Sequence, residues 1–364
     1  MSREVHKGSG RRRGRIALVL ALVLSAGAVV AACGSDDEEG GSGSASSGAA
    51  KLRVIHSSSL DPGEIAGYVA PIEYADEVGL TKLEASDLKT LDSHATAMQV
   101  LLSGKADIVG GSFVSDLQVI EQGVPIKAFC PFSSGFAAVI VGRDEVDSLD
   151  YLAQHKDTPV AIESAGGPVN FFFDLVLQAR NIPLTTQDFT NGKIIEDSPE
   201  RVSALANGDV KATLINFFQL PPLQEELGDK VHVLSDVMGD LGKGGIFLAF
   251  AAKTDWLEQH QDEAAKFCAS VLKADKALTE SFDTFKAAAD KYITPKVDDE
   301  TLKTNWDAIS KYELFPFENT LTQEAVDLVQ KTAVETNILK APIPYDQVVD
   351  AAVIEKAVSL AQGS

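Results

Sequence analysis

Four short polar segments of the sequence each follow an apolar run of strand length and precede a helix-like run. They are Ser57-Ser58-Ser59, Asp92-Ser93-His94, Gly110-Gly111-Ser112-Phe113 and Ser164-Ala165-Gly166-Gly167-Pro168. At such a junction the first backbone N–H groups of the helix lack partners and form its positive end. One junction alone would indicate an ordinary capped turn, because Ser, Gly and Pro favour such positions. Four together indicate a site for a small, strongly polar molecule.

We expect rings and amides near these junctions to complete the site. Phenylalanine rings would offer a flat apolar surface for stacking, and two asparagines would supply hydrogen bonds. No arginine lies in these loops, so we favour a planar heteroaromatic or carboxylated organic ligand over nitrate or a short sulfonate. The predicted ligand-binding residues are Ser58, Ser59, Ser93, His94, Ser112, Phe113, Phe132, Gly166, Gly167, Asn170, Asn216 and Phe217.

Patterns typical of enzymes and metal sites do not occur. The six histidines have no metal-ligand spacing. No Gly-x-Ser-x-Gly elbow is present, and Gly239–Gly245 ("GDLGKGG") lacks the Lys-Ser/Thr pair of a phosphate loop. The sequence therefore predicts a protein that is not an enzyme and has no cofactor and no metal.

The first fifty residues indicate export. A basic stretch (Arg11 to Arg15) precedes an apolar run too short to span a bilayer comfortably, which is typical of a signal segment. Val30-Ala31-Ala32-Cys33 resembles the bacterial lipobox, so we expect a signal at 1–32 and a lipidated Cys33; cleavage by the ordinary signal peptidase is the alternative. Residues 33–50 are Gly/Ser-rich and acidic, as in a flexible tether. The protein would then be anchored by lipid to the outer face of the cytoplasmic membrane.

Charge excludes nucleic acid as a partner. Six of the 32 Lys and Arg and one of the 53 Asp and Glu precede Cys33, which leaves the exported part with a net charge of −26. Such a surface repels phosphate groups, so we predict membrane contact through the lipid only. We also expect a monomer.

Cys130 and Cys268 lie in apolar surroundings, which is typical of structural cysteines. An exported protein can pair two thiols in a disulfide. We favour two buried free thiols and leave the disulfide as the alternative.

Strand-like and helix-like segments alternate along the chain, which predicts an α/β fold with parallel sheets covered by helices. "KLEASDLK" (82–89) is one of the expected strands. "LLSGKADIVGGSF" (101–113) and "LANGDVKATLINFF" (205–218) repeat one plan, a helix end, a glycine and an apolar strand. The repeat predicts two similar lobes, with lobe 1 at 51–138 plus 246–364 and lobe 2 at 139–245, joined by two crossover strands that form a hinge.

"DSHATAMQVLLSGKADIVGGSFVSDLQVIEQGVPIKAF" (92–129) resembles the first lobe of periplasmic solute-binding proteins of ABC importers. The Ser-Gly-x-Ala-Asp turn and the Gln-Gly-x-Pro turn carry the resemblance to the branch that binds sulfonate, nitrate, taurine and thiamine precursors. That branch implies a two-lobed periplasmic-binding-protein type II fold. Many sulfonate binders have Gly-Ser-Thr-x-His where this chain has Gly166-Gly167-Pro168-Val169-Asn170, and that departure argues against a simple sulfonate ligand.

The resemblance implies a function as well. Such a protein captures a small organic ligand, here heteroaromatic, carboxylated or sulfonated, and delivers it to permease and ATPase subunits. A ligand-sensing protein that signals to a receptor is one alternative. A relative of the fungal pyrimidine-synthesising enzymes, which share this fold, is another, but their cysteine-rich signature is absent.

The lipobox generates a prediction. Replacing Cys33 with alanine should abolish lipidation and block removal of the apolar segment, because the thiol is the acceptor of the lipid. Labelled palmitate should therefore enter the wild-type protein and not the Cys33→Ala variant. Wild-type protein that never acquires the label would contradict the proposed anchor.

Overall fold

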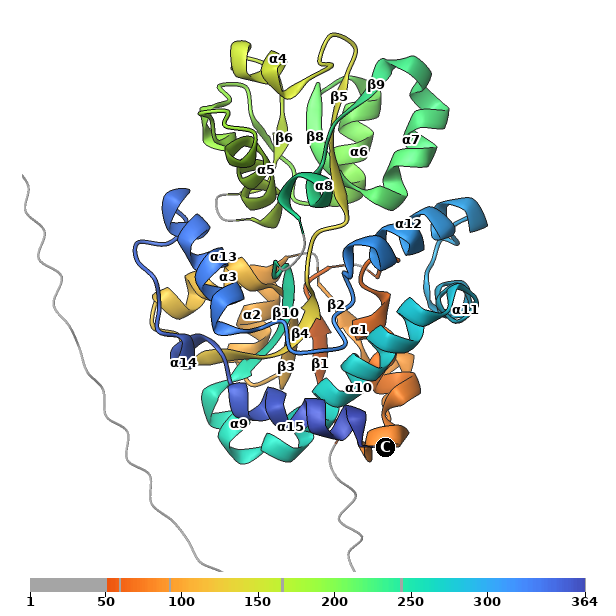
Figure 1. The fold of residues 1–364 in the computed structure, drawn as a ribbon, viewed down its shortest axis with the longest axis vertical. Helices are drawn as coiled ribbons and strands as arrows, with labels where there is room; N and C mark the ends of the chain where they lie inside the picture. Colours follow the sequence, from red (N-terminus) through yellow and green to blue (C-terminus); the bar gives the residue numbers. More distant parts are fainter. Residues whose placement is uncertain (1–50, 59, 92, 165–166, 243–244, 364) are drawn as a thin grey trace, which may run out of the picture. The chain divides into compact units, whose positions relative to one another are not determined.

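The computed structural model describes residues 51–58, 60–91, 93–164, 167–242 and 245–363. Within these residues the chain forms two α/β lobes, each built around its own sheet (Figure 1). The expected signal segment, Cys33 and the linker lie outside the described residues. No helix in the described part of the chain is long and apolar enough to cross a membrane.

The first lobe contains a five-stranded sheet in the order β2-β1-β3-β10-β4. Its strands are β1 (Val54–His56), β2 (Lys89–Thr90), β3 (Ile108–Ser112), β4 (Ile126–Ser133) and β10 (Leu248–Lys253). The expected strand at 82–89 is wrong for most of its length. A short 3-10 turn, Ala85–Asp87, occupies its centre and leaves only β2 at its end.

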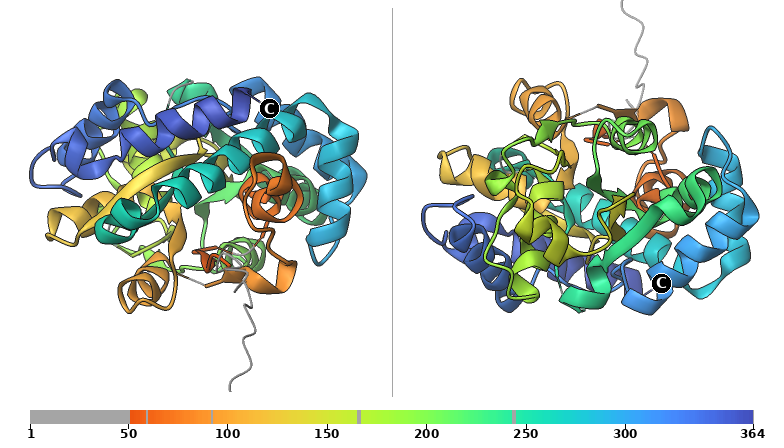
Figure 2. Two further views of the ribbon diagram at one scale, coloured as in Figure 1. Left: turned by 90° about the horizontal axis from the view of Figure 1, so that it is seen from below. Right: turned by 90° about the horizontal axis from the view of Figure 1, so that it is seen from above.

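The helices of the first lobe come from both ends of the described chain. They are α1 (Ile65–Val69), α2 (His94–Leu102), α3 (Phe113–Glu121), α9 (Thr254–Gln259), α10 (Gln261–Glu280), α11 (Phe282–Tyr292), α12 (Asp299–Tyr312), α13 (Gln323–Glu335), α14 (Tyr345–Val348) and α15 (Ala351–Gln362). Figure 2 shows α10 and α15 side by side across one face of the sheet, and both helices contact β4. The C-terminal helices thus pack on the sheet of the first lobe.

The second lobe contains a three-stranded sheet, β8-β5-β9, and a smaller pair, β6-β7. A bridge between Val160 and Ala212 connects the two. The strands are β5 (Ala138–Arg143), β6 (Ala161–Ile162), β7 (Lys193–Ile194), β8 (Ala212–Asn216) and β9 (Val231–Asp236). The helices are α4 (Leu149–Gln154), α5 (Pro168–Ala179), α6 (Ser198–Asn207), α7 (Leu220–Leu227) and α8 (Val237–Leu241).

The sheets are mixed, and the expectation of parallel sheets is correct only in part. Strands β1, β2 and β3 run parallel, but β10 is antiparallel to both β3 and β4. In the second lobe β5 is antiparallel to β8 and β9. The exceptions are the two crossover strands. Each enters its sheet from the opposite lobe, so its direction is set by that connection and not by a local βαβ unit.

The internal sequence repeat corresponds to a structural repeat. Helix α2 leads through Gly104 into β3, and helix α6 leads through Gly208 into β8. Both glycines adopt the left-handed conformation, with φ of +71° and +83°, which favours glycine at a helix C-terminus. The repeat therefore places two equivalent helix–turn–strand units in the two lobes.

A disulfide connects Cys130 of β4 to Cys268 of α10, with Cα atoms 5.3 Å apart. The expectation of two free thiols is therefore wrong. Both cysteines lie in the apolar core, where Phe250 and Phe129 contact Phe267. Helix α10 packs directly on β4, which brings the two cysteines within bonding distance although 138 residues separate them.

The disulfide generates the second prediction. Breaking it should lower the free energy of unfolding by about 2–5 kcal/mol, because a long closed loop restricts the unfolded chain. Urea titration of the wild-type protein with and without reductant measures this difference. A Cys130→Ala/Cys268→Ala variant is the control and should not respond to reductant. A wild-type midpoint that reductant leaves unchanged would contradict the prediction.

Candidate functional site

A cavity of about 530 Å³ opens between the two lobes, and residues of both lobes line it. Its volume lies in the range of pockets that hold small organic ligands. Of the residues predicted from the sequence, the cavity brings together Ser58, Ser93, His94, Ser112, Gly167 and Asn216. Ser59 and Gly166 lie outside the described residues.

The other predicted residues do not line this cavity. The side chains of Phe113 and Phe132 are fully buried in the first lobe, where Phe132 stacks on Phe250. Phe217 packs against the core of the second lobe. The amide of Asn170 bonds the backbone of Glu163 and Ser164, so it shapes the loop before α5 and is not directed at the cavity. The three phenylalanines are placed in this way because an apolar ring after a strand is as readily buried as exposed, and the Asn170 amide is used by its own loop.

Two helices of the first lobe begin at the cavity, and serine caps each of them. The Ser93 hydroxyl accepts a bond from the Thr96 N–H at 3.3 Å, and Ser112 accepts one from Ser115. Behind Ser93, His94 Nε2 lies 2.9 Å from Asp116 Oδ1, and its Nδ1 lies 3.4 Å from the Ser57 hydroxyl. A Cβ on Gly111 would come within 2.5 Å of that ring, so only glycine permits this arrangement.

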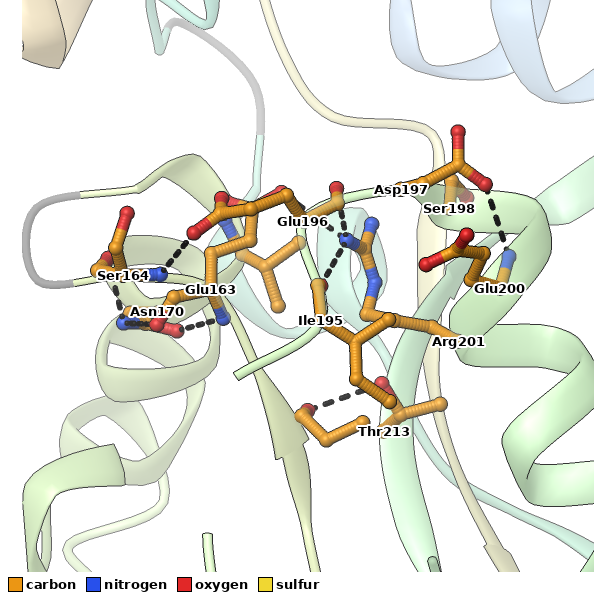
Figure 3. Close-up of polar contacts among 12 residues, drawn as sticks. Glu163, Ser164, Asn170, Ile195, Glu196, Asp197, Ser198, Glu200, Arg201 and Thr213 are labelled. Carbon is orange, nitrogen blue, oxygen red and sulfur yellow. Dashed lines mark hydrogen bonds and ion pairs between the residues drawn. The ribbon is translucent and has the colours of Figure 1, made fainter. Parts of the chain in front are cut away.

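In the second lobe carboxylates occupy the helix N-termini (Figure 3). Glu163 Oε2 accepts the Val169 N–H of α5 at 3.0 Å, and Asp197 Oδ1 accepts the Glu200 N–H of α6 at 2.9 Å. A Cβ on Gly167 would lie 2.5 Å from Glu163 Oε2, so the glycine lets the carboxylate approach the helix. The positions that attract an anion at these two helices therefore already hold one.

Arg201 of α6 balances the charge of Glu163. Its Nη1 lies 3.2 Å from Glu163 Oε1 and donates to the carbonyls of Ile195 and Glu196 at 3.0 and 2.7 Å (Figure 3). Arg201 is 4% exposed and Glu163 9%, so the pair is buried beside the cavity. Burial raises the pKa of the Glu163 carboxyl, and the neighbouring guanidinium opposes that shift.

A second acidic group lies in the first lobe, in the turn before α1. Asp61 Oδ1 accepts the N–H groups of Gly63 and Glu64 at 2.7 and 3.1 Å, and the Ser58 hydroxyl donates to Glu64. Burial raises the pKa of both carboxyls, and the charge of Asp61 raises that of Glu64 further. From the other lobe, Asn216 Nδ2 approaches Asp61 Oδ2 at 3.4 Å.

The aromatic surface of the cavity comes from the segments that join the lobes. Phe136 and Phe247 line the cavity and stack with ring centroids 4.2 Å apart. Phe172 of α5 packs edge-on against both rings. The ring surface expected from the sequence is thus present, but other phenylalanines provide it.

Several lining residues were missed by the sequence reasoning: Asp61, Glu64, Phe136, Glu163, Asp197, Arg201 and Phe247. A signal existed for Asp197, because the repeat that places Ser93 at the cavity places Asp197 at the equivalent helix start. Arg201 lies one turn into that helix. No arginine lies in the four loops, as the sequence analysis states, but Arg201 reaches the cavity from a helix. No comparable signal marked Phe136 or Phe247.

No group of three or more metal-ligating side chains occurs in the described ranges. Comparison with known proteins gives no matching family model. One curated relative is the provisionally named binding protein YtlA of Bacillus subtilis (strain 168). It is 24% identical over 302 residues, which cover 80% of this chain and 87% of the relative.

Solved structures give a consistent fold. The ligand-binding component of an ABC-type import system from Staphylococcus aureus, solved with zinc bound, has a TM-score of 0.66 and 14% identity, covering 85% of this chain and 99% of its own. The nitrate-binding protein NrtA of Synechocystis PCC 6803 has a TM-score of 0.61 and 14% identity, and the match covers 86% of this chain and 90% of NrtA. The aliphatic sulphonate binding protein SsuA of Escherichia coli has a TM-score of 0.57 and 16% identity, and the match covers 82% of this chain and 91% of SsuA. These similarities confirm the two-lobed periplasmic-binding-protein fold predicted from the sequence.

The buried pair of Arg201 and Glu163 generates the third prediction. Replacing Arg201 with leucine should lower the free energy of unfolding by about 3–5 kcal/mol at pH 7, because it leaves a buried carboxylate unpaired. Adding Glu163→Gln should recover part of the loss. Urea titration measures both effects.

The matched control is Arg180→Leu. This substitution breaks an ion pair with Asp240, in which the two side chains are 2.6 Å apart and that of the arginine is 56% exposed. This substitution should cost about 1 kcal/mol or less. Equal losses at the two arginines would contradict the assigned role of Arg201.

Proposed function

We propose that the chain is the extracytoplasmic solute-binding component of an ABC importer, which captures a small organic ligand between its lobes and delivers it to permease and ATPase subunits. The supporting observation is one cavity lined from both lobes, with helix N-termini, carboxylates and amides arranged around it. The fold and the import and binding proteins that share it support the same role. In this function the protein carries no catalytic group and acts by binding alone.

The stacked rings favour a ligand with a flat apolar part. Phe136 and Phe247 offer such a surface at the inner end of the cavity. A planar organic molecule would cover these rings, whereas nitrate would leave them in contact with water. This supports the heteroaromatic alternative among the ligand classes considered from the sequence.

Anchoring and organisation complete the proposal. Acylation of Cys33 would hold the exported protein at the outer face of the membrane, where we propose that it is a monomer. The Gly/Ser-rich linker would let the folded lobes move away from the membrane surface. We place the lobe boundaries at 138/139, at the start of β5, and at 245/246, shortly before β10. Neither a receptor-coupled role nor an enzymatic one is favoured by a particular observation.

Lobe closure is the fourth prediction. A ligand that contacts both lobes should favour the state in which they are close, so binding should compact the protein. The experiment first screens nitrogen heterocycles, aromatic acids, sulfonates and nitrate by thermal shift. At about one hundred times its dissociation constant a ligand stabilises by roughly 2.7 kcal/mol. Small-angle scattering of the protein with each compound that raises the midpoint should then show a smaller radius of gyration.

A compound without a thermal shift serves as the control and should leave the radius unchanged. An unchanged radius with a saturating, stabilising compound would contradict closure. A screen in which no small organic compound of any charge stabilises the protein would contradict the proposed function itself.

A further inference from the structure

A small extension of about 20 Å³ adjoins the cavity and has room for one water molecule or one ligand atom group. Asp61, Glu64, Asn216, Phe136 and Phe247 line both the cavity and this extension. Asn305 of α12 lines the extension but not the cavity. We call these six residues the inner pocket.

The inner pocket contains two carboxylates without a cation. Among the described residues no lysine, arginine or histidine forms an ion pair with Asp61 or Glu64. Their partners are neutral: backbone N–H groups, the Ser58 hydroxyl and the Asn216 amide. Glu163, which is also buried beside the cavity, has Arg201. Glu64 is buried and Asp61 is half-buried. Carboxylates removed from water are normally paired, so Asp61 and Glu64 lack the partner that Glu163 has.

A second observation points to a bound group at the same place. The side chain of Asn305 is 1% exposed, and its amide nitrogen has no hydrogen-bond partner in the part of the chain that the structure describes. It lines the extension together with the two carboxylates. A buried donor of this kind requires an acceptor, and a molecule in the pocket would supply one.

The rest of the cavity disfavours an anion. Glu163 and Asp197 already occupy the N-termini of α5 and α6, and the serine caps of α2 and α3 satisfy donors there. Glu196 also lines the cavity, where its carboxylate accepts the Ser164 N–H at 3.0 Å. The one arginine that lines the cavity among the described residues is committed to Glu163. A sulfonate or nitrate would therefore meet carboxylates without a free cation.

We propose that the inner pocket binds the cationic, N–H-rich group of a small organic ligand, with Asp61 and Glu64 as its counter-charges. Asn305 donates to an adjacent acceptor atom of the ligand. The stacked rings of Phe136 and Phe247 provide the surface for its apolar part. The ligand class is a protonated amine or amidine that carries a flat or apolar body. A cation beside these rings also gains from their negative faces. This inference rests on the proposed function and specifies the ligand of the same cavity.

The experiment compares compounds of equal shape and different charge. Isothermal titration calorimetry at pH 7.5 measures binding of benzamidine, benzamide, benzoate and benzenesulfonate to the exported part of the chain, at concentrations up to 10 mM. A second series uses phenylalaninamide, whose protonated amine lies beside an acceptor carbonyl, and 3-phenylpropionamide, which lacks the amine. We expect the two cations to bind at least tenfold more tightly than the neutral or anionic compound of the same shape.

Variants locate the effect. Asp61→Asn and Glu64→Gln should each weaken binding of benzamidine at least tenfold, since each keeps the side-chain size but removes a carboxyl group that the bound cation would hold ionised. Asp327→Asn and Glu258→Gln remove equal charge at exposed positions of the first lobe and should change it less than twofold. Because the substitutions remove buried charge, the unliganded thermal midpoints of Asp61→Asn and Glu64→Gln should equal or exceed that of the wild type. That measurement separates lost binding from lost folding.

Three outcomes would overturn the inference: anions that bind as tightly as cations, benzamidine binding that survives both inner-pocket substitutions, or a panel in which no cation binds. Anionic or neutral compounds that bind and compact the protein would leave the proposed function intact and reject only the inner-pocket assignment. If no compound of either charge binds or compacts the protein, the proposed function fails as well.

Discussion

A helix that begins at a cavity brings backbone N–H groups without intrahelical partners, and these groups must be satisfied whether or not a ligand is present. Among the described residues, helices α2, α3, α5 and α6 begin at the interlobe cavity. Serine hydroxyls cap the two in the first lobe, and carboxylates of Glu163 and Asp197 serve the two in the second. Side chains of the protein thus occupy helix N-termini that could otherwise hold an anionic solute. In the second lobe these side chains are carboxylates, so they add negative charge to the cavity.

The choice of a carboxylate at α5 has consequences across the second lobe. A buried Glu163 requires a cation, which Arg201 supplies from α6, and Arg201 in turn bonds the carbonyls that precede its own helix. Gly167 is required so that the carboxylate can reach the helix. One ion pair therefore connects β6, the start of α5 and the start of α6, and it leaves no free arginine at the cavity for an anionic ligand.

The architecture was predictable from sequence because it depends on local patterns. Apolar strand runs, serine caps at Ser93 and Ser112 and the glycines at 104 and 208 act over a few residues, and the structure contains each of them as expected. The directions of β5 and β10 were not predictable in this way, since the connection between lobes determines them. The wrong predictions of cavity-lining residues arose because the sequence does not show which apolar side chains are buried in the core. Phe132 and Phe136 are four residues apart in similar surroundings, yet one packs in the core and the other lines the cavity. The disulfide and the Arg201 pair likewise depend on contacts between distant segments.

The ring surface of the cavity and the connection between the lobes are made by the same residues. Phe136 precedes β5 and Phe247 precedes β10, so their stacked rings hold the two crossover segments together. Backbone bonds continue this contact, since the Phe247 N–H donates to Ser133 and the Phe217 N–H donates to Ala137. Phe172 adds a contact from α5 of the second lobe to both rings. A molecule that covers these rings would touch the segments about which the lobes move, while its polar group meets Asp61 of one lobe and Asn216 of the other. Such a ligand would couple binding to lobe position through contact at the crossover segments themselves, without a relay through either core.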